Sequence, residues 1–212
     1  MRSGSEVDVH QMMRELAVVE QFRAAHVKPL ARVAANLRYY VAEASEGAGD
    51  VGQRLKRMST ILDKLGRHPT MQLSRMNDVA GCRGVLPNQA AVDYVIERLQ
   101  GQRRWQLVPR TWDYVAEPKP DGYRAKHLVA IKEGLRIEIQ LRTIGQHQWA
   151  NFVERIDRER GTRAKFGEAD TTLTARLASA AETMSAYERG EASVVELITE
   201  LASVEVEARR KR

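Results

Sequence analysis

The alternation of apolar and polar side chains is strictest in residues 135–142, LRIEIQLR. The apolar set is Leu135, Ile137, Ile139 and Leu141, and the polar set is Arg136, Glu138, Gln140 and Arg142. Because successive side chains of an extended chain point to opposite sides, this segment predicts a strand with an apolar underside and a polar upper face. Residues 127–132 are also strand-like. Glu133 and Gly134 between the two segments predict a hairpin turn, since glycine tolerates a positive φ.

The rest of the chain supplies helices and further strands. Apolar residues recur at helical spacing in residues 8–45, 51–67, 89–101, 144–161 and 168–208, with breaks expected at Pro29 and near Gly190. Extended patterns occupy residues 79–86 and 104–109. Together they predict an α/β (α+β) fold, a mixed β-sheet of about five strands flanked by helices. We expect a central domain over residues 51–160, between helical extensions over residues 1–50 and 161–212.

Residues 51–67 carry a group of basic side chains. If the segment is one helix, Arg54, Arg57 and Lys64 share a polar face, with Lys56 and Ser59 nearby. A basic face in contact with solvent is the ordinary explanation, and phosphate binding is the alternative.

Two charged residues flank or interrupt the apolar segment 79–86. Asp78 stands at its start and Arg83 within it. Burying an unpaired charge costs several kcal/mol, so each of them needs a partner. Either the two pair with each other for structural reasons, or they belong to a functional site.

The amino-acid composition indicates the compartment in which the protein is expected. Cys82 is the only cysteine, which excludes a disulfide framework and a thiolate metal site and suits a reducing cytoplasm. No apolar run approaches the roughly 20 residues that span a membrane, and the sequence MRSGSEVDVH lacks the apolar core of a signal peptide. We therefore expect a cytoplasmic protein without a membrane partner.

The net charge of +6 is concentrated at the C-terminal end of the sequence. Residues 209–212, RRKR, contribute four of the positive charges, so the remaining residues are nearly neutral. Any binding of anions must therefore depend on local clusters of basic residues and not on the field of the whole chain.

Asp78 and Glu138 occupy polar positions of two apolar strands. Two carboxylates on adjacent strands can hold Mg²⁺, which takes oxygen ligands and shares its coordination shell with phosphates. Lysine and arginine side chains around such an ion would bind a polyphosphate. The phosphate-binding loop GxxxxGK[ST] is absent from the sequence, so phosphate binding through such a loop is excluded.

Several motifs in register resemble the synthetase domain of RelA/SpoT-type alarmone synthetases, in the small single-domain form. They are Arg54 and Lys56 with Lys64 eight residues on, DVAGCR at 78–83, DYVxxPKxxGYRAKH at 113–127 and EIQLRT at 138–143. The resemblance covers residues 50 to 157, roughly, and implies a nucleotidyltransferase-like synthetase fold over residues 51–160. The hydrolase domain of the family, with its His-Asp metal motif, has no counterpart in this sequence.

The resemblance implies an Mg²⁺-dependent pyrophosphokinase. Such an enzyme transfers the β,γ-pyrophosphate of ATP to the ribose 3′-hydroxyl of a purine nucleotide, GDP or GTP, giving ppGpp or pppGpp. Asp78 and Glu138 would bind Mg²⁺, and Glu138 would also accept the proton of the attacking hydroxyl. The implied ATP-binding residues are Arg54 and Arg83 around the adenine and Lys56, Ser59 (or Thr60) and Lys64 on the phosphates. The implied acceptor-binding residues are Lys119, Tyr123 (stacked on the base), Arg124, His127, Gln140, Arg142 and His147.

Two departures from the family pattern concern the acceptor. Trp112 replaces an arginine that usually contacts phosphate, and His147 replaces an asparagine that reads guanine. Three hypotheses therefore remain: a synthetase of guanosine or adenosine alarmones, a toxin that pyrophosphorylates the 3′ CCA end of tRNA, and a non-catalytic nucleotide-binding regulator. The partners to expect are ATP, a guanine or adenine nucleotide, tRNA or an antitoxin protein, and a second copy of the chain in a homo-oligomer.

Overall fold

The computed structural model of the protein describes residues 9–161 and 171–210. At its centre lies a six-stranded sheet with the strand order β1-β2-β6-β5-β3, and β4 pairs with β5 beside this path. The strands are β1 (Asp50–Leu55), β2 (Ala80–Leu86), β3 (Gln106–Leu107), β4 (Trp112–Asp113), β5 (Lys126–Lys132) and β6 (Leu135–Thr143). β2 and β6 run parallel and the other pairs antiparallel. The predicted mixed sheet flanked by helices is confirmed, with six strands where about five were expected.

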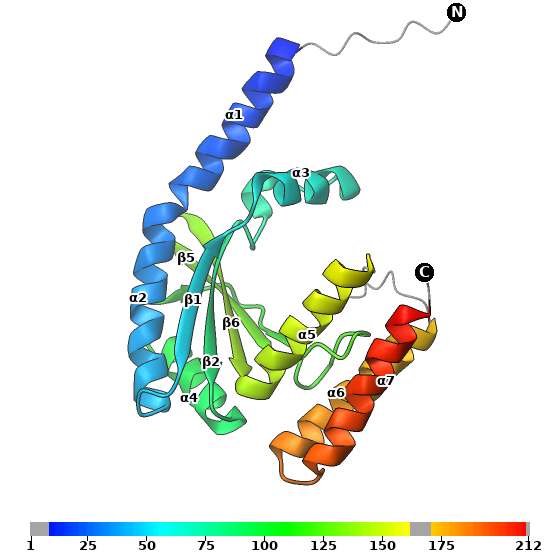
Figure 1. Cartoon of the computed structure of the whole chain (residues 1–212). Coiled ribbons are helices and arrows are strands. Elements are labelled where there is room, and N and C mark those ends of the chain that lie inside the picture. Colours follow the sequence, from blue (N-terminus) through cyan, green and yellow to red (C-terminus); the bar gives the residue numbers. More distant parts are fainter. Residues whose placement is uncertain (1–8, 162–170, 211–212) are drawn as a thin grey trace, which may run out of the picture.

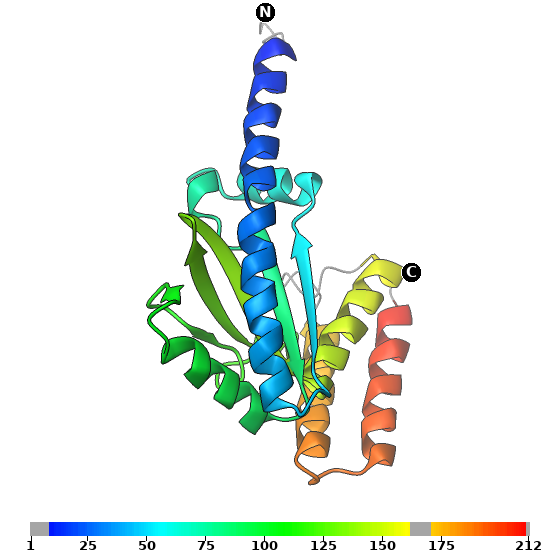
Figure 2. The same ribbon diagram turned by 90° about the vertical axis from the view of Figure 1, so that its left-hand side faces the viewer.

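The helices lie on both sides of the sheet and beyond it (Figure 1). They are α1 (Val9–Ala25), α2 (Val27–Ala44), α3 (Met58–Arg67), the short 3-10 helix η1 (Leu73–Arg75), α4 (Gln89–Gln100), α5 (Ile144–Arg160), α6 (Thr171–Glu188) and α7 (Val194–Arg209). α2 packs on the sheet and on α4, and the α6–α7 hairpin packs beside α5. Figure 2 shows α1 projecting beyond the sheet in line with α2. None of the helices in the described ranges is long and apolar enough to cross a bilayer.

The main core fills the space between α2, α4 and the apolar side of the sheet. Ile137, Ile139 and Leu141 of β6 are fully buried there, in one cluster with Leu37 of α2 and Val92 of α4. Burying each such side chain contributes about 1.5–3 kcal/mol to folding. The prediction that β6 has an apolar underside is therefore confirmed.

The hairpin between β5 and β6 follows the sequence pattern closely. Lys132 pairs with Leu135, so Glu133 and Gly134 form the two-residue turn. Both have positive φ, 55° and 76° respectively, as tight hairpin turns of this length require.

The expectation of a single helix over residues 51–67 was wrong. Asp50–Leu55 form strand β1, which pairs with β2 along its whole length, and α3 begins only at Met58. Val51 and Leu55 pack against the core beneath the sheet, and this alternation is compatible with a strand. Arg54 therefore lies on the sheet and does not share a helix face with Arg57 and Lys64.

The other helix boundaries differ in detail from the sequence pattern. α1 and α2 separate at His26, before Pro29. Pro29 lies in the first turn of α2, where its missing N–H has no helical partner to lose. Gly190, with φ of 74°, follows the end of α6, so the break expected there is confirmed. The predicted helical residues 168–170 lie outside the described part of the chain.

Candidate active-site cleft

A cleft of about 1020 Å³ lies over the polar face of the sheet, with residues of α3 and α5 among its walls. Its lining collects the basic residues Arg54, Lys56, Arg57, Lys64, Arg67, Arg75, Lys119, Arg142 and Arg158. The carboxylates in the same lining are Asp78, Asp121, Glu138 and Glu154. This excess of positive charge in a concave site attracts polyanions such as nucleoside triphosphates, although the chain as a whole carries little net charge beyond its tail.

Strand register explains how the cleft floor is assembled. Glu138 of β6 pairs with Gly81 of β2, which in turn pairs with Arg54 of β1. Directly paired residues project to the same side of a sheet, so Arg54 and Glu138 share the cleft face. Glycine at position 81 puts no side chain between them.

The next row of the sheet places a second set of polar residues on this face. Gln140 pairs with Arg83 on one side and with His127 on the other. Arg83 pairs with Gly52 of β1, and a Cβ atom added to Gly52 would lie 3.5 Å from the Arg83 guanidinium. The guanidinium therefore extends across β1 in the space that Gly52 leaves open.

Asp78 is held by two lysines from different elements. Lys56 Nζ donates to its Oδ2 and Lys64 Nζ to its Oδ1, both at 2.8 Å. Burial opposes ionisation of Asp78, but the hydrogen bonds from Lys56 and Lys64 outweigh it, and the pKa of this carboxyl lies below its ordinary value. Asp78 is thus partnered by lysines, and the alternative of a structural Asp78–Arg83 pair is not what the structure shows.

Glu138 is held by a histidine ring and an amide. His127 Nδ1 lies 3.2 Å from its Oε1, and Gln140 Nε2 donates to its Oε2 at 2.7 Å. Burial raises the pKa of Glu138 and the hydrogen bonds of His127 and Gln140 lower it, with a net shift below the ordinary value. Asp78 acts on the same carboxyl through its negative charge, so the two carboxylates are within electrostatic reach of each other.

Aromatic rings and cations are interleaved at the entrance of the cleft. Lys119 Nζ lies 4.6 Å from the centre of the Tyr114 ring and 4.8 Å from that of Tyr123. Arg142 Cζ is also 4.8 Å from the centre of the Tyr123 ring. A nucleotide base stacking on Tyr123 would compete with these cations for the ring. Burial raises the pKa of the Tyr123 hydroxyl to about 12.

Most of the expected site residues line this one cleft. They are Arg54, Lys56, Lys64, Asp78, Lys119, Tyr123, His127, Glu138, Gln140 and Arg142. Ser59 does not line it, whereas its neighbour Thr60 does, because Thr60 and Lys64 lie four residues apart on one face of α3.

Arg124 lies outside the cleft, contrary to the expectation that it contacts an acceptor phosphate. Its buried side chain forms an ion pair with Glu182 and donates to the carbonyl oxygen of Ala181, both on α6. Arg124 thus ties the loop before β5 to α6.

Arg83 and His147 are not among the residues that line the cleft, and they share a positively charged environment. Burial and then the charges of Arg83 and Arg142 lower the pKa of His147. His147 Nε2 contacts Asn151 Nδ2 at 3.2 Å. Among the described residues, the buried atoms without a hydrogen-bond partner include His147 Nδ1, Arg83 Nε and Arg142 Nε.

Some residues of the cleft were missed or underrated by sequence reasoning. Arg67 shares the polar face of α3 with Thr60 and Lys64, and this helical spacing was a usable signal. Arg75 of η1 and Arg158 of α5 reach the cleft from positions far apart in the sequence. No local pattern marks such residues, because only the tertiary fold brings them together.

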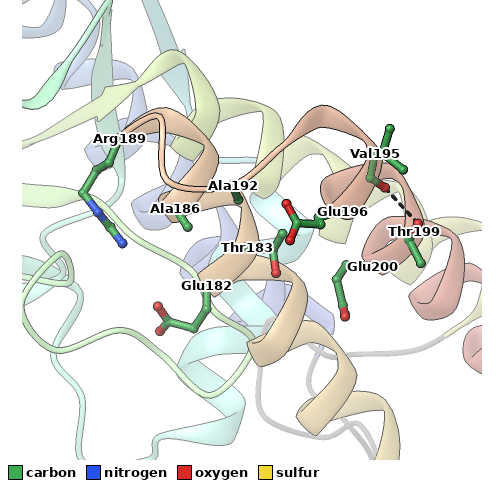
Figure 3. A pocket seen from close by; sticks show the side chains of 9 residues that line it. All are labelled: Glu182, Thr183, Ala186, Arg189, Ala192, Val195, Glu196, Thr199 and Glu200. Atoms are coloured by element: carbon green, nitrogen blue, oxygen red, sulfur yellow. Dashed lines mark hydrogen bonds between the residues drawn. The ribbon is translucent and has the colours of Figure 1, made fainter.

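A smaller groove of about 500 Å³ lies between α6 and α7 (Figure 3). Glu182, Glu196 and Glu200 line it together with Arg189. Its predominantly acidic lining would repel phosphates. The basic cleft over the sheet is therefore the candidate active site, and Glu182 connects the groove to the cleft entrance through Arg124.

The basic cleft with its four carboxylates, built on a mixed sheet, has the charge needed to bind polyanions. Residues 53–157 match the family model described as "Region found in RelA / SpoT proteins", and the chain belongs to this family. The GTP pyrophosphokinase YjbM of Bacillus subtilis is 31% identical over 109 residues, which cover 47% of this chain and 51% of the relative. The chain thus spans about half the length of the curated relatives it matches.

Solved structures share the fold over most of their length. The small alarmone synthetase 1 of Bacillus subtilis bound to its product pppGpp superposes with a TM-score of 0.62 and 24% identity, over 81% of this chain and 94% of that one. A GTP pyrophosphokinase family protein from Streptococcus pneumoniae gives a TM-score of 0.65 and 20% identity, over 86% and 96% respectively. The fold of the chain is therefore that of the small alarmone synthetases.

Proposed function

We propose that the protein transfers the β,γ-pyrophosphate of ATP to the ribose 3′-hydroxyl of a purine nucleotide. The observation that carries the proposal is the pair Asp78 and Glu138 in a cleft lined by nine Lys and Arg side chains, within the region matched to RelA/SpoT proteins. A relative named GTP pyrophosphokinase and a neighbour solved with pppGpp favour GDP or GTP as the acceptor.

The reaction requires one bond to form and one to break. The acceptor O3′ attacks the β-phosphorus of ATP, and the bond between that phosphorus and the oxygen bridging to the α-phosphorus breaks, so AMP leaves. Glu138 takes the proton of the 3′-hydroxyl. Positioning and charge neutralisation supply most of the catalysis in such transfers, which accords with the number of cations around Glu138.

The ATP-binding half of the cleft lies on β1, α3 and β2. Lys56 and Lys64 are placed to hold phosphates, with Thr60 on the same face of α3. Arg54 and Arg83 project from neighbouring strands on the cleft side of the sheet, where two planar guanidinium groups can enclose the adenine ring.

The residues present fit a magnesium ion. Two carboxylates are few for an ion held by protein alone, and in the described part of the chain no three His, Cys, Asp or Glu side chains gather as a metal site. Mg²⁺, however, commonly uses one or two carboxylates and takes its remaining ligands from phosphates and water. Bound at Asp78 and Glu138, it would neutralise charge on the transferred group. Lys56 and Lys64, which hold both oxygens of Asp78, would then turn to the phosphates.

The acceptor side is formed by the loop before β5 and by β6. Lys119, Tyr123, Gln140 and Arg142 all line the cleft on this side. Trp112 adds an aromatic surface to this side. We propose that the acceptor is a guanine nucleotide. The competing acceptors are tRNA and adenine nucleotides, and the experiment must distinguish them from GDP and GTP.

The test is the release of AMP from ATP and Mg²⁺ in the presence of GDP, GTP, ADP or deacylated tRNA, each added separately. We expect AMP formation to depend on GDP or GTP, together with a product that carries two additional phosphates. Dependence on tRNA alone would replace the proposed acceptor by the CCA end. If none of the four acceptors supports the formation of AMP, the proposed transfer itself would be contradicted.

A further inference from the structure

We propose that Arg142, Tyr123 and His127 position the carboxylate of Glu138 through a closed ring of hydrogen bonds, which we call the Glu138 ring. Its members are Glu138, Gln140, Arg142, Tyr123 and His127. The inference rests on the proposed function, because positioning has a catalytic consequence only if Glu138 is the proton acceptor. It assigns Tyr123 and His127 a role other than contact with the acceptor base or phosphates.

The ring starts at a single nitrogen of Arg142. Its Nη2 atom donates to the hydroxyl oxygen of Tyr123 at 2.7 Å and to Oε1 of Gln140 at 2.9 Å. A guanidinium NH₂ group carries two hydrogens and accepts none, so both are committed. Two chains of hydrogen bonds, which we call arms, therefore start at Arg142, and in both of them Arg142 is the donor.

The first arm passes through Tyr123 and His127. The Tyr123 hydroxyl lies 2.7 Å from His127 Nε2. Because the hydroxyl oxygen accepts from Arg142, its own hydrogen is free to be donated to Nε2. A neutral imidazole that accepts at Nε2 carries its hydrogen on Nδ1. This Nδ1–H then faces Oε1 of Glu138, 3.2 Å away.

The second arm passes through the amide of Gln140. Its Oε1 accepts from Arg142, which leaves Nε2 as the donor to Oε2 of Glu138 at 2.7 Å. The orientation of the amide is thereby fixed. Each oxygen of Glu138 thus receives one hydrogen bond, and both bonds trace back to Arg142.

The members of the Glu138 ring have little freedom to leave it. The side chains of His127 and Arg142 are buried, and His127 pairs with Gln140 across β5 and β6. Glu138, Gln140 and Arg142 are alternate residues of one strand and share its cleft face. A carboxylate fixed in this way presents the same lone pairs to every incoming 3′-hydroxyl, and such preorganisation raises turnover more than it raises affinity.

The decisive variant is Tyr123→Phe, which keeps the aromatic ring and removes only the hydroxyl. It removes both hydrogen bonds of the Tyr123 hydroxyl, to Arg142 and to His127, and so interrupts the first arm. Any stacking of the Tyr123 ring on a base stays intact. We expect kcat to fall on the order of tenfold or more, with the KM for the acceptor within about twofold of wild type. Tyr114→Phe is the matched control, because the Tyr114 ring packs against those of His127 at 5.1 Å and Tyr123 at 5.9 Å, whereas its hydroxyl forms no hydrogen bond to any member of the Glu138 ring. A fall in kcat that is as large in Tyr114→Phe, or a Tyr123→Phe effect confined to KM, would overturn the inference.

A second measurement tests the hydrogen bonds of the Glu138 ring without an activity assay. The ¹⁵N and ¹H resonances of His127 in the protein without nucleotide report which ring nitrogen carries the hydrogen. We expect the Nδ1–H tautomer in wild type and in Tyr114→Phe, and a gain of the Nε2–H tautomer in Tyr123→Phe. An Nε2–H tautomer in wild type would overturn the inference even in a fully active enzyme. A protein that shows the expected tautomers but transfers nothing would instead refute the proposed function.

Discussion

At the scale of single residues, the two candidate carboxylates are held in different ways. Asp78 is neutralised by Lys56 and Lys64, whereas Glu138 receives hydrogen bonds from a histidine and an amide. The lysines suit a position where positive charge is exchanged for a metal ion and phosphates. The groups that hydrogen-bond to Glu138 include neither a lysine nor an arginine, which accords with the proposed role of Glu138 as the proton acceptor.

Lys64 offers a test of this division. Lys64→Met removes one cation from the proposed phosphate-binding side of the cleft and keeps an unbranched side chain in α3. We expect ATP to bind on the order of tenfold more weakly, because a charge-assisted hydrogen bond to phosphate is lost. Isothermal titration with a non-hydrolysable ATP analogue measures the change. Lys132→Met, at the far end of β5 and outside the cleft lining, is the control that should bind as wild type does.

The candidate site was predictable where its residues stand in contiguous motifs. Asp78, Glu138, Lys56 and Lys64 were expected in one site, and the structure brings them to one cleft. Arg124 was expected in the same site but is not among the residues that line the cleft, because a sequence motif records that an arginine is present but not which neighbour it faces. Its partner Glu182 lies 58 residues away, and only the packing of α6 against the loop shows the pairing.

At the scale of elements, α5 and α6 support the loop that forms the entrance of the cleft. Gly122 of this loop has φ of 74° and packs so closely on α6 that an added Cβ would lie 2.2 Å from the Cβ of Ala181. Trp149 of α5 donates to the carbonyl oxygen of Asp121 at 3.1 Å. The loop is thus held from two helices.

Gly122→Ala tests this support, with Gly134→Ala as its control. Both glycines have positive φ, but nothing lies within 4 Å of a Cβ added at Gly134. We expect Gly134→Ala to cost about 1–2 kcal/mol through backbone strain alone. Gly122→Ala should cost more, because it also forces the loop away from α6. Chemical denaturation compares the two, and equal losses would show that the contact with α6 adds no stability.

The junction of α1 and α2 contains a buried titratable group. His26 is fully buried, with Nδ1 2.7 Å from the carbonyl oxygen of Phe22. Burial lowers the pKa of His26 below its ordinary value of 6.5. The unfolded chain therefore binds a proton at a higher pH than the folded protein does. As a result, the free energy of unfolding decreases as the pH falls from 6.5 toward the lowered pKa.

We expect His26→Gln to remove this part of the acid sensitivity. The free energy of unfolding of wild type should decline as the pH falls below 6.5, whereas that of the variant should decline less over the same interval. Chemical denaturation at a series of pH values compares the two slopes. Parallel curves would mean that His26 is not buried in its neutral form.

The strand β1 marks the limit of sequence reasoning at this scale. Its residues have a short apolar alternation followed directly by the helical pattern of α3, and the two merge into one apparent helix. What makes residues 50–55 a strand is pairing with β2 over their full length, a tertiary contact that no local propensity encodes. The β5–β6 hairpin, by contrast, was predictable because its pattern and its turn are both local.

At the scale of the whole molecule, charge is distributed so that the cleft is basic and the α6–α7 groove is acidic. The mixed sheet and its flanking helices were predictable from the order of the apolar patterns. The arrangement of α1 beyond the sheet and of the α6–α7 hairpin beside α5 was not (Figure 1), since contacts between distant segments leave no period in the sequence.

The transfer of a pyrophosphate group is the central claim, and ATP labelled at the β-phosphate tests it most directly. Incubated with Mg²⁺ and GDP or GTP, wild-type protein should move the label to the acceptor and release unlabelled AMP. Glu138→Gln should lose this transfer by at least two orders of magnitude while its melting temperature and its affinity for an ATP analogue stay close to wild type. Label recovered in ADP, or near-normal transfer by the folded variant, would contradict the account.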